Sequence, residues 1–323
     1  MALNFPSSAS GLSKRLNNLP QKPSIGLALG SGASRGWSHV GIIKALSEAG
    51  IEPDVVCGTS VGAMVGAAYA TGRLDKLRSW VLGSTRGDVL RFFDIKLSQA
   101  GLVNVERWTR FLHTYVAAED VRIEDLAKKY VAVATDFDTG REVWFREGLL
   151  AEAVRASMAM PGLYPAVRDQ QRWLVDGGLV NPVPVNACRA LGAEVVIAVN
   201  LNSDIMRRAG RKSAAIKHPD SGMLASLKQQ ARDYSSNLFP HGDDKVVPPG
   251  MLDAVSGSIN IFQDRITRSR LAGDPADIVI SPRLGDMGIL EFQRAGDAMK
   301  EGEDRVNSAL PDIHRAIELT TRA

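Results

Sequence analysis

Residues 24–62 read SIGLALGSGASRGWSHVGIIKALSEAGIEPDVVCGTSVG, and this stretch decides the fold class. Residues 24–29 are short and apolar and run into a Gly-rich turn, which is typical of a buried strand. Residues 37–49 have helical periodicity, residues 54–57 form a second short apolar run, and residues 61–71 predict a helix of small and apolar side chains. This strand–helix–strand–helix order predicts an α/β fold in which a parallel sheet carries helices on its faces.

Later segments continue this pattern. Apolar runs predict strands at residues 130–135, 142–145, 173–175, 194–201 and 277–280, the first two joined by turn residues 136–140. Helical periodicity predicts helices at residues 74–82, 149–160, 183–191 and 252–271 and over the C-terminal residues. The stretch from residue 83 to about residue 120 has a mixed pattern and predicts no single element.

Composition excludes several protein classes. The chain has 323 residues, 45% hydrophobic and 23% charged, which is ordinary for a globular protein and excludes disordered and fibrous classes. With 39 basic and 36 acidic residues, the charge is too balanced to indicate a nucleic-acid partner, while contact with an anionic membrane surface stays open. Two cysteines, Cys57 and Cys188, exclude a disulfide scaffold and a Cys-rich zinc site.

Composition also divides the chain. Residues 1–22 are rich in Ser, Asn and Pro and lack the apolar core of a signal peptide, so we expect a flexible arm and a cytoplasmic protein. Residues 23–203 hold the α/β pattern, residues 204–250 are basic and rich in Gly and Pro and predict a variable linker or lid, and residues 251–323 predict a C-terminal helical region that completes the fold.

Two features after residue 203 suggest a membrane contact. The predicted linker holds a basic cluster, Arg207, Arg208, Arg211, Lys212 and Lys217, which would favour an anionic surface. The helix that follows has one apolar face, made of Leu252, Val255, Ile259, Phe262 and Ile266. Such a face usually packs on its own domain, and the alternative is contact with lipid.

The first motif with chemical meaning is Gly58-Thr59-Ser60-Val61-Gly62, a G-x-S-x-G between a predicted strand and a predicted helix. A nucleophile elbow needs this spacing, because the turn that lifts the serine hydroxyl above the sheet leaves no room for bulky neighbours. The N–H groups at the start of the following helix favour negative charge at the site.

The second motif is the glycine loop, residues 30–36, which reads GSGASRG. Its small residues let consecutive backbone N–H groups bind a phosphate or an oxyanion. A dinucleotide fold would need glycine at position 35, where this chain has Arg35, although Glu52 and Asp54 lie near the spacing of a ribose-binding acid. The oxyanion interpretation is favoured, because the next strand ends at Ser60.

The third motif, Asp176-Gly177-Gly178, follows a short strand. Glycines after an aspartate allow a tight turn that keeps the carboxylate accessible, and in isolation such a motif indicates only a β-turn.

In this order the three motifs resemble the patatin-like phospholipase family, whose pattern is G-x-G-x-x-[RK]-G, then G-x-S-x-G, then D-G-[GA]. The resemblance is closest to the bacterial RssA-like branch and extends through ATDFDTGREVWF, RASMAMPGLYPAV and LVDGGLVNPVPVNACRALGAEVVIAVNL. It covers residues 24–203 and a short C-terminal stretch, ILEFQRA. It implies a three-layer α/β/α fold in which residues 23–203 form the catalytic domain.

The resemblance also implies a mechanism. Ser60 would be the nucleophile of a serine acyl-ester hydrolase, with Asp176 as its general base in a dyad without histidine. The oxyanion hole would be formed by Gly32 and Ala33, aided by Ser34. The glycines that shape the motif turns would be Gly30, Gly36, Gly58, Gly62, Gly177 and Gly178. Arg35 would hold the loop, and a carboxylate or carbonyl partner is expected near it.

No metal or organic cofactor is implied. Asp136, Asp138 and Glu147 have calcium-loop spacing, but Arg141 stands where that loop requires glycine. The expected substrate is an acyl lipid or ester. Three alternatives stay open: a triad that includes a histidine, a regulatory or scaffold protein that kept the fold with little turnover, and a nucleotide-binding protein that uses the glycine loop.

Overall fold

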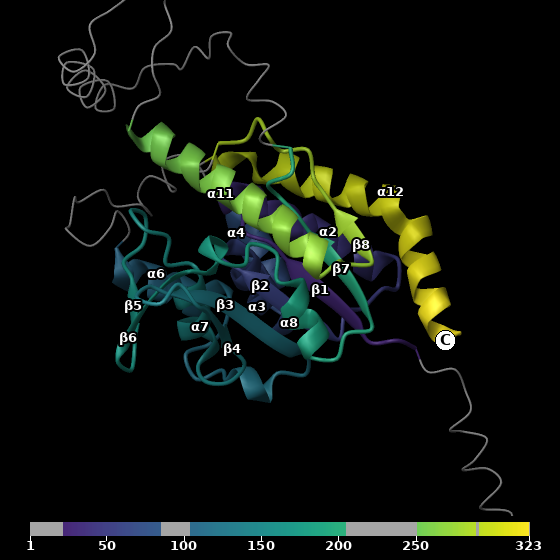
Figure 1. The fold of residues 1–323 in the computed structure, drawn as a ribbon, viewed down its shortest axis with the longest axis horizontal. Helices are drawn as coiled ribbons and strands as arrows, with labels where there is room; N and C mark the ends of the chain where they lie inside the picture. The colour runs from purple at the N-terminus through teal and green to yellow at the C-terminus, as the bar shows by residue number, and fades with distance from the viewer. Residues whose placement is uncertain (1–21, 85–103, 205–250, 289–290, 323) are drawn as a thin grey trace, which may run out of the picture.

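The computed structural model describes residues 22–84, 104–204, 251–288 and 291–322, drawn in colour in Figure 1. The expected arm lies outside the described residues apart from Lys22, and the expected linker apart from Asp204. The basic cluster lies in that undescribed linker. The predicted division of the chain therefore stays a prediction at both places.

A single eight-stranded mixed sheet forms the centre of the fold, in the order β5-β6-β3-β2-β1-β7-β8, with β4 also paired to β3. Strands β3, β2, β1, β7 and β8 run parallel, while β4 and β6 are antiparallel to β3. The strands are β1 (Ile25–Leu29), β2 (Val55–Thr59), β3 (Lys129–Asp136), β4 (Glu142–Phe145), β5 (Val167–Asp169), β6 (Arg172–Asp176), β7 (Val195–Val199) and β8 (Ile278–Ile280). The predicted mainly parallel sheet and its 142–145 hairpin are confirmed.

Helices cover both faces of the sheet. They are α2 (Ser38–Glu48), α3 (Val61–Ala70), α4 (Leu74–Gly83), α6 (Val105–Tyr115), α7 (Leu150–Ser157), α8 (Val185–Ala190), α11 (Met251–Gly273) and α12 (Ala295–Thr321). Short 3₁₀ turns are η1 (Ala33–Trp37), η2 (Ile123–Asp125), η3 (Gly177–Leu179) and η4 (Phe292–Arg294). Figure 1 shows β5, β6 and α7 at one end of the molecule and β8 with α12 at the other.

Alternate residues of the central strands face opposite layers. In β1, Leu27 and Leu29 belong to the larger hydrophobic core, which also contains residues of α2, α3 and α12, whereas Ala28 belongs to a second core with residues of α8. Every residue of β1, β2 and β7 is buried, as expected for parallel strands covered on both faces. The architecture is therefore the three-layer α/β/α fold that the sequence predicts.

Three elements differ from prediction. Strand β5 and helix α6 were not predicted, and α6 begins where the Asn104 side chain accepts a hydrogen bond from the Arg107 amide at 3.1 Å. The helix predicted over residues 149–160 ends at Ser157. It ends early because the Ala159 carbonyl accepts a hydrogen bond from the backbone of Asp176 at 3.0 Å, which takes this segment out of the helix.

Helix α11 packs on the domain through a polar face, and not through the apolar face that the sequence predicts. Phe262 is 60% exposed, whereas Gln263, Asp264 and Thr267 are buried. The side chains of Leu252 and Val255 lie outside the described residues, and Ile259 and Ile266 are half-buried. The prediction that Phe262 packs on the domain is wrong, because α11 lies on polar loop ends, which require polar side chains on its inward face.

Helices α2 and α12 cross at two glycines. A Cβ atom on Gly41 would lie 2.0 Å from the Met299 carbonyl oxygen, and one on Gly302 would lie 2.3 Å from the Ser38 carbonyl oxygen. The two backbones approach this closely because neither glycine carries a side chain.

We expect Gly302→Ala to lower the free energy of unfolding by about 1–3 kcal/mol, because its methyl group must push the two helices apart. Gly257→Ala on α11 is a matched control, since a Cβ there meets no atom within 4 Å. The free energy of unfolding of this control should rise by up to about 1 kcal/mol, because alanine has a higher helix propensity than glycine. Urea denaturation measures both variants, and a Gly302→Ala protein as stable as the control would contradict the close crossing.

Candidate active site

Ser60 sits on a strained turn between β2 and α3, with backbone angles φ 58° and ψ −125°. Its N–H group donates to the Ser157 hydroxyl at 2.9 Å, and that hydroxyl donates to the Val133 carbonyl at 2.6 Å. A Cβ on Gly62 would lie 2.1 Å from the Leu29 carbonyl oxygen, so only glycine lets α3 start this close to β1. The G-x-S-x-G motif therefore forms the predicted elbow.

Asp176 ends β6 directly opposite this serine. The Ser60 hydroxyl donates to Oδ2 of Asp176 at 2.6 Å, and the Gly178 amide donates to Oδ1 at 2.7 Å. The Thr135 hydroxyl donates to the backbone carbonyl of Asp176 at 2.8 Å. Strand β6 pairs only with the last three residues of β3, 134–136, so its own last residue places this carboxylate in the site from a position 116 residues after Ser60.

The Asp176 carboxyl group is fully buried, and this sets its acidity. Burial raises its pKa to about 7, although the hydrogen bonds from Ser60 and Gly178 act in the opposite direction. A carboxylate with a pKa near neutrality is suited to accept and return a proton at physiological pH.

The glycine loop is held by the strands beside it. The Gly30 amide donates to the Val199 carbonyl at 3.1 Å, and the Ser31 amide donates to the Pro182 carbonyl at 2.8 Å. Ala33 has a positive φ of 51°, a strained conformation for alanine, and it lines the same pocket as Ser60. Across the residues that the structure describes, the amides of Gly32 and Ala33 find no hydrogen-bond acceptor.

Two loop residues serve the scaffold. The buried Ser34 hydroxyl donates to the Gly288 carbonyl at 2.6 Å, so only the backbone of Ser34 remains for a role at the oxyanion. A Cβ on Gly32 would lie 2.6 Å from Cδ1 of the buried Leu201, so the loop packs directly on this core side chain.

Arg35 is buried without a carboxylate partner in the described part of the chain. Its guanidinium donates to the Gly32 carbonyl, to Oδ1 of Asn202 and to Oδ1 of Asn260, each at 3.1 Å. Burial lowers the pKa of Arg35 to about 10, so the group keeps its positive charge at neutral pH. The partners expected from the sequence are therefore carbonyl oxygens.

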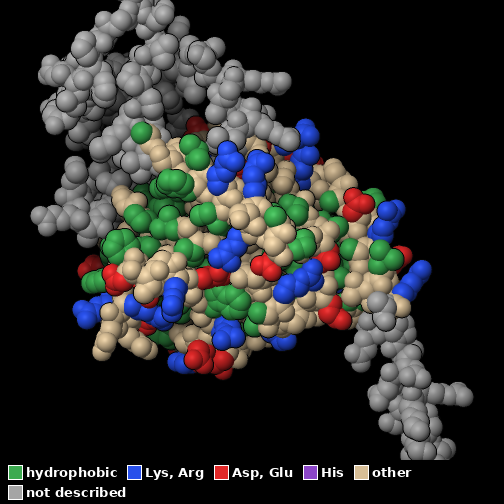
Figure 2. Space-filling model, viewed as in Figure 1, with side chains coloured by type: hydrophobic (Ala, Val, Ile, Leu, Met, Phe, Trp, Pro, Cys, Tyr) green, Lys and Arg blue, Asp and Glu red, His purple; other side chains and the backbone are tan. Residues whose placement is uncertain are grey.

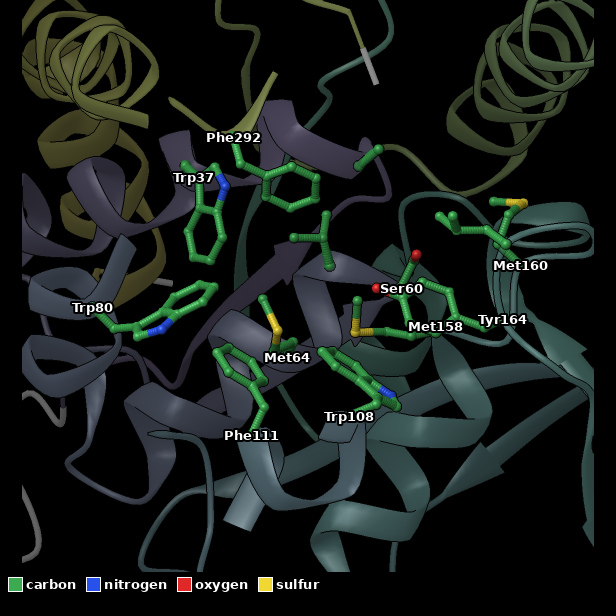
Figure 3. Close-up of a pocket in the computed structure, with 13 residues that line it drawn as sticks. Trp37, Ser60, Met64, Trp80, Trp108, Phe111, Met158, Met160, Tyr164 and Phe292 are labelled. Atoms are coloured by element: carbon green, nitrogen blue, oxygen red, sulfur yellow. The ribbon is translucent and has the colours of Figure 1, made fainter. Parts of the chain in front are cut away.

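An apolar pocket opens beside Ser60, as Figure 3 shows. Aromatic rings dominate it: Trp80 and Phe111 meet edge-on with ring centroids 4.6 Å apart, and Trp108 lies 5.1 Å from Tyr164. Trp37 and Phe292 form a further edge-on pair at 6.2 Å. The pocket can take an apolar chain whose polar end reaches the serine hydroxyl.

His39 and the candidate ribose-binding acid have structural roles, while His218 and His241 lie outside the described residues. Nε2 of His39 lies 2.8 Å from the Gly30 carbonyl, and burial lowers its pKa to about 4, so His39 is a neutral donor that holds the glycine loop. Asp54 accepts from the Ile25 amide at 2.9 Å, at the start of β1 and thus at the opposite edge of the sheet from the glycine loop. A ribose-binding acid belongs at the loop edge.

The segment with calcium-loop spacing forms a tight turn at Asp136. Oδ1 of Asp136 accepts from the amides of Asp138 and Thr139 at 3.1 Å, which is turn geometry. Within the described ranges, no group of three or more His, Cys, Asp or Glu side chains is arranged to hold a metal ion.

Several site residues were not singled out from the sequence. The pocket aromatics Trp80, Trp108, Phe111 and Phe292 come from α4, α6 and η4, far apart along the chain. Ser157 lies in the quoted stretch RASMAMPGLYPAV, and a serine three residues before the end of the predicted helical run was the available signal.

Comparison with known proteins gives a consistent result. The model of the family described as patatin-like phospholipase matches residues 27–189. The uncharacterized NTE family protein Rv1063c of Mycobacterium tuberculosis is 31% identical, covering 89% of this chain and 91% of that protein. Human patatin-like phospholipase domain-containing protein 6 is 36% identical over 55% of this chain and 13% of its own length.

Among solved structures, VipD from Legionella pneumophila aligns over 90% of this chain and 67% of its own, with a TM-score of 0.45 and 14% identity. The family match spans half of the chain and contains the elbow, the glycine loop and the Asp176 turn. The chain belongs to the patatin-like phospholipase family.

Proposed function

We propose that this protein is a serine hydrolase of acyl lipid esters that uses Ser60 and Asp176 as a catalytic dyad. The observation that carries the proposal is the buried 2.6 Å hydrogen bond from the Ser60 hydroxyl to Asp176, placed at the end of an apolar pocket. Family membership supports lipid hydrolysis in general, and this geometry supports the specific roles.

In the first half-reaction, Oγ of Ser60 attacks the ester carbonyl carbon while its proton moves to Oδ2 of Asp176. The amides of Gly32 and Ala33, with the backbone of Ser34, stabilise the oxyanion that forms; removing one such donor typically costs ~10²–10³-fold in turnover. The tetrahedral intermediate collapses, the C–O bond to the alcohol breaks, and the leaving alkoxide takes the proton back from Asp176.

In the second half-reaction, Asp176 accepts a proton from water, whose oxygen attacks the acyl-enzyme carbonyl. Collapse of this intermediate breaks the bond to Oγ of Ser60, and the serine regains its proton. The products are a carboxylic acid and an alcohol. Throughout, the acyl chain occupies the aromatic pocket, whose apolar lining keeps bulk water from the dyad.

The scaffold alternative makes a different prediction for reactivity. A protein that kept only the fold would not need a serine in a strained turn against a buried carboxylate. Labelling by a fluorophosphonate probe that disappears in Ser60→Ala would support the enzyme, whereas an unlabelled wild-type protein would support the scaffold.

A peripheral contact with an anionic membrane is a further part of the proposal. No helix among the described residues is long and apolar enough to span a membrane. On α11, however, Ile261 and Phe262 are 42% and 60% exposed. On the face in Figure 2, Lys and Arg are interspersed with acidic and apolar side chains, so contact there would combine weak attraction with insertion of apolar groups.

We expect Ser60→Ala to abolish ester hydrolysis and Asp176→Asn to lower kcat/KM by ~10²–10⁴-fold, because one removes the nucleophile and the other the base. Both variants should fold, since each substitution preserves most of the side-chain volume. Ser308→Ala and Asp304→Asn, on the exposed surface of α12, are matched controls with full activity. Near-wild-type turnover of Asp176→Asn would refute the dyad.

The pH dependence follows from the raised pKa of Asp176. The base acts only when ionised, so kcat/KM should rise with pH, inflect at about pH 7 and level off above it. Below the inflection, the activity should fall tenfold per pH unit. Initial rates on an uncharged ester from pH 5 to 9 measure this, and a flat profile across that range would contradict the assignment.

We expect reversible binding to anionic vesicles that weakens as salt rises. Phe262→Ser should reduce it, while the control Leu319→Ser, which removes a side chain 64% exposed at the end of α12, should not. Glutamine in place of the undescribed basic residues 207, 208, 211 and 212 should also reduce binding. Vesicle co-sedimentation measures the binding of each variant, and hydrolysis of a soluble ester checks that each variant is folded. Binding that does not depend on salt, or no binding at all, would refute the membrane contact.

A further inference from the structure

The orientations of two buried amide side chains follow from one guanidinium. Arg35 can only donate, so the Asn202 atom that it contacts at 3.1 Å is the acceptor Oδ1. Nδ2 of Asn202 is then directed to Oε1 of Gln263, to which it donates at 3.0 Å. The same Oε1 accepts from the Ser31 hydroxyl at 3.3 Å. The Gln263 nitrogen must therefore point away from Asn202.

That nitrogen lies beside the Asp176 turn. A Cβ on Gly178 would lie 2.5 Å from Nε2 of Gln263 and 2.9 Å from both Oδ1 of Asp176 and Oγ of Ser31, so the donor and the carboxylate oxygen face one small space. Nε2 is buried and has no acceptor in the described part of the chain. A buried donor without a partner is costly, and a nearby anion is the group that such a donor favours.

We propose that Asn202 and Gln263 form a polar relay that starts at Arg35 and ends beside Asp176, in which Gln263 is a positioning residue that keeps an N–H donor close to the ionised carboxylate. The inference rests on the proposed role of Asp176 as the base. The positive guanidinium polarises both amides in the same direction, which strengthens the last donor. Because Oε1 also holds Ser31, Gln263 ties the glycine loop to the base.

The surroundings of Asp176 leave this role to Gln263. Ser60 faces the carboxylate from the elbow, and Tyr164 faces it from the segment after α7. Burial and the negative charge of Asp176 together raise the pKa of the Tyr164 phenol. The backbone of Gly178 supplies the other donor, and Arg35 stands at the far end of the relay. No further charged group acts on the Asp176 pKa among the described residues.

The test is the pH profile of kcat/KM. In Gln263→Met, which keeps the length but removes the donor, we expect the inflection to move up by about one pH unit. Activity below the inflection should then fall about tenfold, and the high-pH plateau should largely return. Gln263→Glu should move the inflection to still higher pH, because its carboxylate repels that of Asp176. Thr267→Val, also buried on the inward face of α11, is the matched control and should not move it. A loss that is equal at every pH would overturn the relay.

A readout without substrate separates this inference from the proposed function. A ¹³C NMR titration of side-chain carboxyl groups, with the Asp176 signal assigned by its loss in Asp176→Asn, gives the pKa directly. A higher pKa in Gln263→Met supports the relay, and an unchanged pKa overturns it. If Ser60→Ala retains hydrolysis, the proposed function fails while this titration still decides the relay.

Discussion

The hydrogen bond between the Ser60 hydroxyl and the Asp176 carboxylate is the interaction on which the rest of the structure depends. The proposed reaction needs a stronger base than an exposed aspartate, and such a base arises when the carboxylate lies away from water. Burial of a carboxylate is expensive unless nearby donors compensate. The close packing at Gly62 lets the elbow lie directly on the sheet beside the carboxylate. The amide of Gly178 donates a hydrogen bond that satisfies one carboxylate oxygen.

This constraint explains why α11 faces inward with polar side chains. The helix lies on the loops that follow β1 and β7, and a leucine in place of Asn260 would leave Arg35 with one acceptor fewer. Asn260 and Gln263 instead complete the network, while Phe262 is left outside. A buried polar network of this kind stabilises one arrangement only when its members are satisfied together, so the helix and the glycine loop hold each other in register.

The sequence predicted the fold and the sharp turn at Ser60 because both depend on local signals. Strand, turn and helix patterns around Ser60 determine the elbow, and neighbouring parallel strands present their carboxyl ends at one edge of the sheet. Local signals do not place Asp176 in the site, because it comes from an antiparallel strand. The family pattern supplied that expectation. Gln263 and Trp108 gave no such signal, because their roles arise from contacts between segments far apart in the chain. Phe262 was misplaced because helical periodicity cannot tell a polar docking surface from an apolar one.

The choice of neutral acceptors around Arg35 follows from the same chemistry. A carboxylate there would cancel the guanidinium charge and place a second negative group near Asp176 and near the oxyanion that the proposed reaction generates at Gly32. Carbonyl oxygens from Gly32, Asn202 and Asn260 satisfy the N–H groups without cancelling the charge. The uncompensated positive charge, held in a buried region where water does not screen it, then favours the negative charge that the proposed reaction generates at Gly32. The cost of burying Arg35 is thus linked to the two steps in which the reaction creates an anion.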